Sequence, residues 1–396
     1  MTISLSQSDA RKIVLNSQRL HSRRSFGRGA EASLKAIEHL SYVQIDTLSV
    51  VARAHLHTLW NRVESFSPDH IDQLQRAGQV FEYWSHALSI LPMKDYRFAL
   101  PMMERIASGE THWYPKNPKE TTKILKRIRE EGPLLAKDFS DKKKSQAMWS
   151  RSPSKIALEQ LFMEGELMTA RRINFHKVYD LRERVLPSGC DTRTPNEDEL
   201  CRHLVRAYLR AHSIGQATEV SYLRKGLGLA MKKVIQEMEE EGEIQTLTVA
   251  GEPYFCLAKE LERLGKIGGT SSSPKKLRIL SPFDNSVIQR KRVSKLFDYD
   301  YQVECYVTKA KRRYGYFCLP ILSNNQLLGR LDAKASRKDG VFHILHLHLE
   351  KPVKNSAAFY SALEKELKRF AAFDGCDQIS LHKVSGADVL PEWGQA

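Results

Sequence analysis

The chain has 396 residues, which is enough for two to four domains with a sizeable core. Its composition, 41% hydrophobic and 28% charged, excludes a disordered or membrane-embedded protein, and no apolar run is long enough to cross a bilayer. Its 62 Lys and Arg residues and 47 Asp and Glu residues give a net charge of +15, which favours nucleic acid or an anionic membrane surface as the partner. The alternative is an enzyme that is basic without binding a polyanion.

The first region, residues 1–150, has the pattern of a winged helix, which is a helix-turn-helix unit with strands appended. Apolar spacing predicts helices over 3–20 and 31–40, a basic turn between them, and a short extended segment at 43–46. A further helix is expected at 68–78. The aromatic segment 81–92 should return to the extended segment, and helical insertions should fill the rest of the region.

The extended segment carries an amide and a carboxylate on one face. Side chains alternate along a strand, so Val43 and Ile45 should face the core while Gln44 and Asp46 point the other way. Such a pair can hold a water molecule and take a proton from it. Asp46 is also well placed to cap a following helix at Thr47-Leu48-Ser49, and spacing alone favours the cap.

Two more winged-helix regions are predicted, at 151–195 and 196–264. The second region combines a helix at 154–164 with a strand at 173–179 and a basic wing. The third has helices at 197–210 and 231–241, and the second of these carries four glutamates. Since carboxylates repel phosphates, that helix is expected to be scaffold rather than a DNA-reading element.

The last region, 265–396, begins with a Gly- and Ser-rich stretch at 265–273, which predicts a linker, and then changes to strands. Five strands are predicted between 276 and 349, two of them joined by a turn at Asn324-Asn325. A final helix over 356–370 should pack on them. The predicted fold class is therefore α+β, with tandem winged-helix domains followed by a C-terminal β-barrel.

Other chemical centres find little support in the sequence. The six cysteines are scattered without a C-x-x-C pair, so we expect neither a zinc site nor disulfides, and a reducing cytoplasm fits. His346 and His348 would share a strand face with no further ligand nearby, which favours an outward polar face over a metal site. No nucleotide-binding or acyl-transfer motif occurs, no signal peptide is evident, and no cofactor is expected.

Four stretches resemble one known family. The runs YVQIDTLSVVARAHLHTLWNR (42–62), EYWSHALSILP (82–92), LSPFDNSVIQRKRVSKLFDYDYQVECYVTKAKRRYGYFCLP (280–320) and LLGRLDAKASR (327–337) are similar to the AlkZ/YcaQ family of winged-helix DNA glycosylases. The resemblance covers nearly the whole chain. It implies a C-shaped stack of tandem winged helices closed by a β-barrel, with duplex DNA in a central channel.

The resemblance also implies the reaction and its residues. Family members hydrolyse the N-glycosidic bond of alkylated purines, notably N7-alkylguanine, and unhook interstrand crosslinks. Their catalytic motif is Gln, an apolar residue, then Gln or Asp, so Gln44 and Asp46 are the predicted catalytic residues, in the order that the YcaQ (AlkX) branch has. Because the motif contains no lysine, a monofunctional glycosylase is expected.

The predicted DNA contacts are basic, aromatic and amide residues of these stretches and of the basic wing: Arg53, His55, Trp60, Arg62, Trp84, His86, Arg171, Arg172, His176, Lys177, Arg312, Arg313, Asn324 and Asn325. The expected partner is double-stranded DNA with alkylated or crosslinked bases, bound by a cytoplasmic, nucleoid-associated monomer without a metal or membrane contact. The alternative is a non-catalytic winged-helix transcriptional regulator, which needs no carboxylate beside Gln44. A third hypothesis, a nuclease, requires clustered carboxylates that bind metal ions, and the sequence shows no such cluster at a suggestive spacing.

Overall fold

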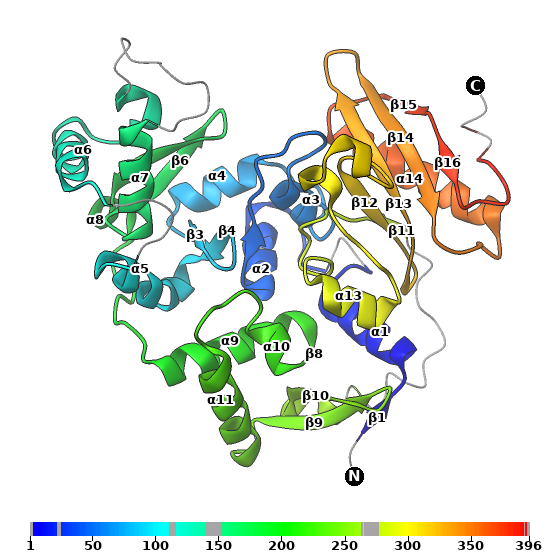
Figure 1. The fold of residues 1–396 in the computed structure, drawn as a ribbon, viewed down its shortest axis with the longest axis horizontal. Coiled ribbons are helices and arrows are strands. Elements are labelled where there is room, and N and C mark those ends of the chain that lie inside the picture. Colours follow the sequence, from blue (N-terminus) through cyan, green and yellow to red (C-terminus); the bar gives the residue numbers. More distant parts are fainter. Residues whose placement is uncertain are drawn as a thin grey trace.

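The structure is a computed structural model that describes residues 3–21, 25–110, 116–139, 152–262, 264, 277–391 and 393 (Figure 1). The predicted linker at 265–273 lies outside the described residues. Helices and strands mix along the chain, which confirms the α+β class. Among the described residues, no helix combines the length and apolar character needed to cross a bilayer.

One order of elements, a helix, a short strand, a helical turn or helix, a helix and a hairpin, occurs three times. The first copy is α2 (Gly29–Leu40), β2 (Val43–Gln44), α3 (Ala54–Trp60), α4 (Asp69–Arg76), β3 (Val80–Trp84) and β4 (Leu88–Pro92). The second is α6 (Pro118–Glu131), β5 (Leu134–Leu135), η2 (Ala136–Phe139), α7 (Pro153–Met163), β6 (Leu167–Ile173) and β7 (His176–Leu181). The third is α9 (Glu197–His212), β8 (Ile214–Gly215), α10 (Ala217–Val220), α11 (Gly228–Glu240), β9 (Ile244–Val249) and β10 (Glu252–Leu257). We call these the first, second and third units.

Each unit closes its sheet in the same way, because the short strand pairs with the second strand of the hairpin. The strand orders are β2-β4-β3, β5-β7-β6 and β8-β10-β9. The N-terminal strand β1 (Ser4–Leu5) adds to the third sheet in parallel with β9, and α1 (Gln7–Ser17) follows it. The helix predicted over 3–20 is therefore shorter than expected and is preceded by a strand.

The connections between units are helical. The segment after the first unit forms η1 (Met93–Ala99) and α5 (Leu100–Ala107), and α8 (Arg182–Val185) and η3 (Ala258–Glu260) follow the second and third hairpins. The predicted domain boundary at residue 150 falls between α6 and α7. These two helices share one core, in which Ile124 and Ile128 meet Ala157 and Leu158, so a division at that point separates helices that pack together.

The C-terminal region contains one curled sheet of six strands. Its elements are β11 (Leu277–Ile279), α13 (Arg290–Phe297), η4 (Glu304–Tyr306), η5 (Lys309–Lys311), β12 (Cys318–Ser323), β13 (Gln326–Ser336), β14 (Val341–Leu349), α14 (Ser356–Phe373), β15 (Gln378–Leu381) and β16 (Val384–Ser385). The order is β11-β12-β13-β14-β15, with β16 also on β14. In the described residues β11 and β15 are the two ends of this order, so the predicted barrel is a half-barrel.

The first unit and the C-terminal sheet share a hydrophobic core. Ile45 and Leu59 lie in the same buried cluster as Phe342 of β14 and as Leu363 and Phe370 of α14. The prediction that the final helix packs on the sheet is therefore confirmed. Because Ile45 belongs to this core, the backbone beside Gln44 and Asp46 is held in place by residues that lie far away in the sequence, in β14 and α14.

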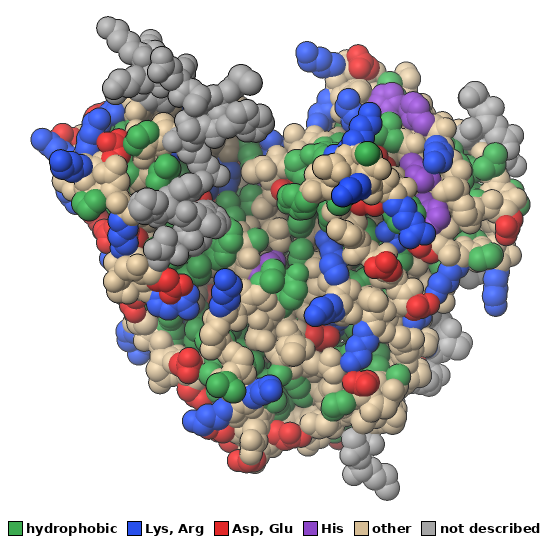
Figure 2. Space-filling model, viewed as in Figure 1, with side chains coloured by type: hydrophobic (Ala, Val, Ile, Leu, Met, Phe, Trp, Pro, Cys, Tyr) green, Lys and Arg blue, Asp and Glu red, His purple; other side chains and the backbone are tan. Residues whose placement is uncertain are grey.

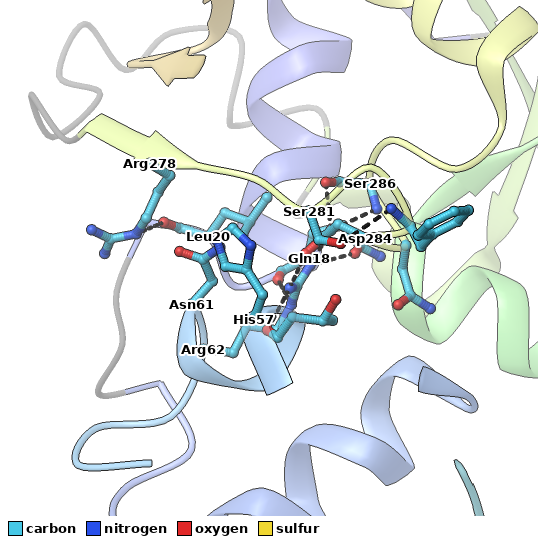
Figure 3. A network of polar contacts seen from close by, with 12 residues as sticks. Gln18, Leu20, His57, Asn61, Arg62, Arg278, Ser281, Asp284 and Ser286 are labelled. Carbon is cyan, nitrogen blue, oxygen red and sulfur yellow. Dashed lines mark hydrogen bonds and ion pairs between the residues drawn. The ribbon is translucent and has the colours of Figure 1, made fainter. Parts of the chain in front are cut away.

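A buried polar network joins the same two regions (Figure 3). Arg62, at the end of α3, donates to both carboxylate oxygens of Asp284, at 2.6 and 2.9 Å, and also donates to the side chain and the backbone carbonyl of Gln18. Asn61 donates from Nδ2 to the Ile279 carbonyl of β11. Arg62 and Asp284 are both fully buried. A buried charge is stable only when it is paired and hydrogen-bonded, and this one is both.

The overall outline is notched. Figure 1 places the second unit and the C-terminal sheet on opposite sides of the first unit, and Figure 2 shows the surface hollowed between them. Lys and Arg side chains lie over both flanking lobes in Figure 2. The residues that connect β2 with α3 contact both lobes: Arg53 lies on Phe175 of the second unit, and Val50 accepts a hydrogen bond from Ala335 of the C-terminal sheet.

Candidate active site at the Gln44–Asp46 segment

Gln44 and Asp46 lie on the same side of the extended segment, as predicted. Val43 is 0% and Ile45 is 7% exposed, while Gln44 and Asp46 are half-buried. The segment is held by β4: Val43 pairs with Ile90, Gln44 pairs with Ser89, and the Ile45 N–H donates to the Leu88 carbonyl at 2.8 Å. The predicted return of segment 81–92 to this strand is therefore confirmed.

Asp46 does not cap a helix. The next helix, α3, begins at Ala54 with Arg53 at its N-cap, and residues 46–53 have no regular structure. The helix-cap interpretation, which local spacing favoured, is therefore wrong. The carboxylate of Asp46 is left to another role.

The environment of the Asp46 carboxylate suits a base. Burial raises its pKa, while hydrogen bonds from the Leu48 and Thr47 backbone N–H groups and the charge of Arg53 act in the opposite direction. Its Oδ2 atom is buried and has no hydrogen-bond partner among the described residues. A buried acceptor without a partner costs free energy, and that cost falls when a water molecule or a substrate group donates to it.

His86 fixes the amide of Gln44. It lies in the turn between β3 and β4, and its Nε2 is 3.0 Å from Gln44 Oε1. Burial lowers the pKa of His86 to about 4, so the ring is neutral at pH 7. Since a carbonyl oxygen can only accept, Nε2 carries the proton and donates, which leaves the NH2 group of Gln44 to donate elsewhere. His86, predicted as a DNA contact, is thus positioned to orient Gln44.

The aromatic surroundings hold His86 in turn. Its ring meets Tyr42 edge-on, with centroids 4.9 Å apart, and Tyr222 of the third unit at 5.6 Å. Arg224, two residues further on, donates to the Ser85 hydroxyl beside His86. The third unit therefore supports the turn that carries His86 through Tyr222 and Arg224.

The second unit reaches the site through the tip of its β6–β7 hairpin. Phe175 lies in this turn with φ +70°, and the guanidinium of Arg53 stacks on its ring at 3.9 Å from the centroid. Arg172 covers the same ring at 4.4 Å, and His55 stacks against it at 5.8 Å. The side chain of Arg53, next to Asp46, is consequently held by an aromatic residue of another unit.

The C-terminal region holds the irregular segment from the other side. The Ala335 N–H donates to the Val50 carbonyl at 2.8 Å, and the Ala52 N–H donates to Asp374 Oδ2 at 3.0 Å. Arg337 donates to the Ser49 carbonyl and pairs with Asp374. Burial raises the pKa of Asp374 to about 6, although Arg337 opposes the shift. These contacts fix the conformation of residues 46–53, which form neither a helix nor a strand.

Three predicted DNA contacts are wrong because their side chains are buried. Arg62 is 0% exposed and is bound to Asp284, and Trp60 is 8% exposed and stacks on Phe373 at 5.5 Å in the shared core. His55 is 6% exposed, and burial lowers its pKa to about 3, so it is also uncharged. All three side chains lie where the first unit packs against another part of the chain: Arg62 and Trp60 against the C-terminal region, and His55 against Phe175 of the second unit.

Three further predicted contacts also interact within the chain and stay predictions. The Asn324-Asn325 turn joins β12 and β13 as predicted, and Asn325 Nδ2 donates to the Ser8 hydroxyl of α1 at 3.3 Å. Arg172 forms a double hydrogen bond with Glu82, at 2.6 and 2.7 Å.

The remaining candidates keep a surface position and stay predictions. Trp84, Arg171, Lys177 and Arg312 are half-buried, and His176 and Arg313 are exposed. Lys177 lies over the Phe162 ring, with Nζ 3.6 Å from the centroid, and burial lowers its pKa to about 8. In the described ranges no three His, Cys, Asp or Glu side chains converge as a metal site would require. His346 and His348 both contact the Ser385 hydroxyl, in agreement with a shared polar face.

Sequence reasoning missed several residues that shape the site. Phe175, Tyr222 and Asp374 act through contacts between distant segments, and no local pattern marks them. Tyr306 is different, because an aromatic residue beside the basic run 309–313 is a visible signal. The structure leaves its side chain 80% exposed.

Comparisons with known proteins agree with this geometry. A family model described as DNA glycosylase AlkZ-like matches residues 37–373, a range that includes Gln44 and Asp46. The solved structure of the Streptomyces sahachiroi DNA glycosylase AlkZ is similar to this chain with a TM-score of 0.67 at 14% sequence identity, and the match covers 96% of this chain and 100% of that one. At that identity the structural likeness shows a shared fold.

Proposed function

The chain belongs to the AlkZ-like DNA glycosylase family, and from this premise we propose that it hydrolyses the N-glycosidic bond of alkylated purines such as N7-alkylguanine in duplex DNA. The observation that carries the proposal is the carboxylate of Asp46. It has a buried oxygen without a partner among the described residues, and it lies beside an amide that His86 orients. Gln44-Ile45-Asp46 resembles the motif of the YcaQ (AlkX) branch, and we include that branch in the proposal.

The proposed chemistry needs a base more than an acid. Alkylation at N7 makes guanine cationic, so the base leaves with the bonding electron pair and without prior protonation. Asp46 stabilises the positive charge that develops at C1′ and takes the proton from the water whose oxygen attacks that carbon, as carboxylates do in glycoside hydrolysis. Gln44 donates from its NH2 group to the water or to the nucleotide. General base catalysis of this kind contributes about 10²- to 10⁴-fold in rate.

The residues around the carboxylate favour a DNA substrate. Arg53 brings a positive charge next to Asp46 and is held on the Phe175 ring, and Lys and Arg side chains lie over the lobes on both sides of the notch (Figure 2). Phosphates bind such charges, and the affinity falls steeply with salt. An open notch also suits a purine that is tethered to the opposite strand, because a crosslinked base cannot be extruded freely into a closed pocket. We therefore include unhooking of interstrand crosslinks in the proposal.

We further propose that the three units are winged-helix domains. Each has the order helix, strand, helical turn, helix and hairpin, and each pairs its short strand with the second hairpin strand. Segment 41–53 contains no lysine to form a Schiff base, which supports a monofunctional enzyme. The monomeric state and the cytoplasmic, nucleoid-associated location stay predictions.

The test compares the wild type with Asp46→Asn on a duplex that carries N7-methylguanine, and on one with a nitrogen-mustard crosslink. We expect the wild type to release the base, leave abasic sites and unhook the strands, and we expect the variant to be at least about 100-fold slower. Lys351→Ala, which changes an exposed side chain in the connection after β14, is the matched control. Equal release by both proteins would remove Asp46 from the mechanism. Binding of duplex without any base release would favour the transcriptional regulator.

A further inference from the structure

Tyr306 is an exposed aromatic residue next to the proposed catalytic carboxylate. It ends η4 and is 80% exposed, whereas most Phe, Tyr and Trp side chains of the described residues are buried. Burial raises the pKa of Cys305 and of Tyr306, and the charge of Asp46 raises both further, an effect that falls off with distance from the carboxylate. An exposed aromatic side chain in such a place is typical of a contact surface, because removing its apolar area from water lowers the free energy only when a partner covers it.

The exposure of Tyr306 belongs to a braced loop, residues 304–315. The carboxylate of Glu304, itself 8% exposed, accepts from the backbone N–H groups of Arg313, Tyr314 and Gly315 at 2.8 to 2.9 Å. These three bonds tie the two ends of the loop together. They fix the backbone that carries Tyr306, whose side chain contacts Cys305 of the same turn and still leaves its ring exposed to solvent.

A second brace lies inside the loop. Arg312 donates from Nε to the Val307 carbonyl at 2.9 Å, and its guanidinium covers the Tyr316 ring at 4.7 Å from the centroid. Tyr316 in turn packs on the core that contains Ile45. The loop is therefore anchored through Tyr316 to the hydrophobic core that the first unit shares with the C-terminal sheet.

The same loop carries positive charge at its tip. Lys309, Lys311 and Arg313 are exposed, and no carboxylate within the loop faces them, since Glu304 is turned inward to the backbone. In Figure 1 the loop is drawn in yellow beside α3, on the side of the C-terminal lobe that borders the notch. Exposed cations around an exposed aromatic ring match a nucleic acid, which offers phosphates and flat bases together.

We propose that Tyr306 stacks on the nucleobase beside the damaged nucleotide while Lys309, Lys311 and Arg313 hold the flanking phosphates. This rests on the proposed function, because the damaged nucleotide is the one whose C1′ meets Asp46. Stacking on a base plane does not depend on the identity of the base, so it serves a substrate of any sequence. The ring would fill the space beside the lesion and keep the sugar against the carboxylate. Tyr306 is thus a positioning residue that contacts substrate DNA.

The test measures binding and base release separately. The probe for binding is a duplex with a tetrahydrofuran abasic analogue and 2-aminopurine in the adjacent position, titrated with proteins that carry Asp46→Asn so that no chemistry intervenes. Base release is followed in single turnover on the N7-methylguanine duplex. The variants are Tyr306→Ala, Tyr306→Phe and Tyr306→Trp, and the control is Leu390→Ala, which shortens an apolar side chain that is 52% exposed.

We expect Tyr306→Ala to weaken binding and slow base release by about 5- to 150-fold, the range of a lost stacking contact. The 2-aminopurine signal that changes on binding should then stay at its free-duplex value. Tyr306→Phe, Tyr306→Trp and the control should behave like the unsubstituted protein, because a ring is enough for stacking.

Three outcomes separate this proposal from the proposed function. Binding and base release by Tyr306→Ala at the unsubstituted level would overturn the stacking role. A loss in Tyr306→Phe as large as in Tyr306→Ala would also overturn it, since the hydroxyl would then be the group that matters. If the wild type released no base but Tyr306→Ala bound the abasic duplex more weakly, the stacking role would stand and the proposed glycosylase activity would fail.

Discussion

The buried pair of Arg62 and Asp284 allows a direct test of how the site is supported. The change is Asp284→Ala. It leaves the guanidinium of Arg62, which is 0% exposed, without the two charge-assisted bonds at 2.6 and 2.9 Å. The Ser286 N–H and hydroxyl lose their acceptor as well. Breaking one side of a buried ion pair costs about 3 to 5 kcal/mol, because an uncompensated charge stays in a low-dielectric interior.

The assay is urea unfolding at pH 7, followed by tryptophan fluorescence, since Trp60 lies two residues from Arg62. Lys351→Ala serves as the control, because it breaks an ion pair with Asp298 whose side chains are 50% and 74% exposed. The control should unfold at the same urea concentration as the wild type. The double change Arg62→Met with Asp284→Leu should recover part of the loss, since it removes both charges at once.

The pH dependence adds a second readout. Burial by itself would raise the pKa of Asp284, but Arg62 and the bonds from Ser286 outweigh it, so the pKa lies below the usual 3.8. The stabilisation is therefore present above pH 3.8 and is lost as the pH falls through the lower, folded-state pKa. A midpoint for Asp284→Ala that equals that of the control at pH 7 would refute the role given to this pair.

Two further predictions concern the catalytic face. His86→Ala should slow single-turnover base release by about 2- to 12-fold, the worth of one hydrogen bond to Gln44; an unchanged rate would contradict the orienting role. Since burial raises the pKa of Asp46, base release should decline on acidification at a higher pH than the usual aspartate value of 3.8 allows, after correction for spontaneous depurination. Asp46→Asn should lack this decline, and a wild-type profile flat down to pH 4 would show that Asp46 is not the base.

Much of the site was predictable because its first determinant is local. Alternation over Val43, Gln44, Ile45 and Asp46 depends only on neighbouring residues, and the structure has the predicted faces. The return of segment 81–92 and the packing of the final helix followed from apolar spacing in the same way. The family resemblance then gave the paired amide and carboxylate a chemical meaning, and the family match confirms the resemblance.

Other predictions failed where local preference competed with distant contacts. Asp46 is a good cap residue by type, but the helix begins only at Ala54, because residues 49–52 bind Ala335, Arg337 and Asp374 of the C-terminal region. Hydrogen bonds to these residues satisfy backbone groups of the irregular segment that would otherwise be paired within a helix. None of these three partners can be predicted from the sequence of the segment itself.

The amino-acid sequence alone determined the composition, the local periodicities and the pair of residues that can do chemistry. Tertiary structure decided which charged and aromatic side chains are buried. Arg62 and Arg313 are the same residue type. Arg62 is buried and bound to an aspartate 222 positions away, whereas Arg313 is exposed on a loop. Burial is a property of the whole packed chain, since it depends on which distant segments meet, and no window of neighbouring residues contains that information.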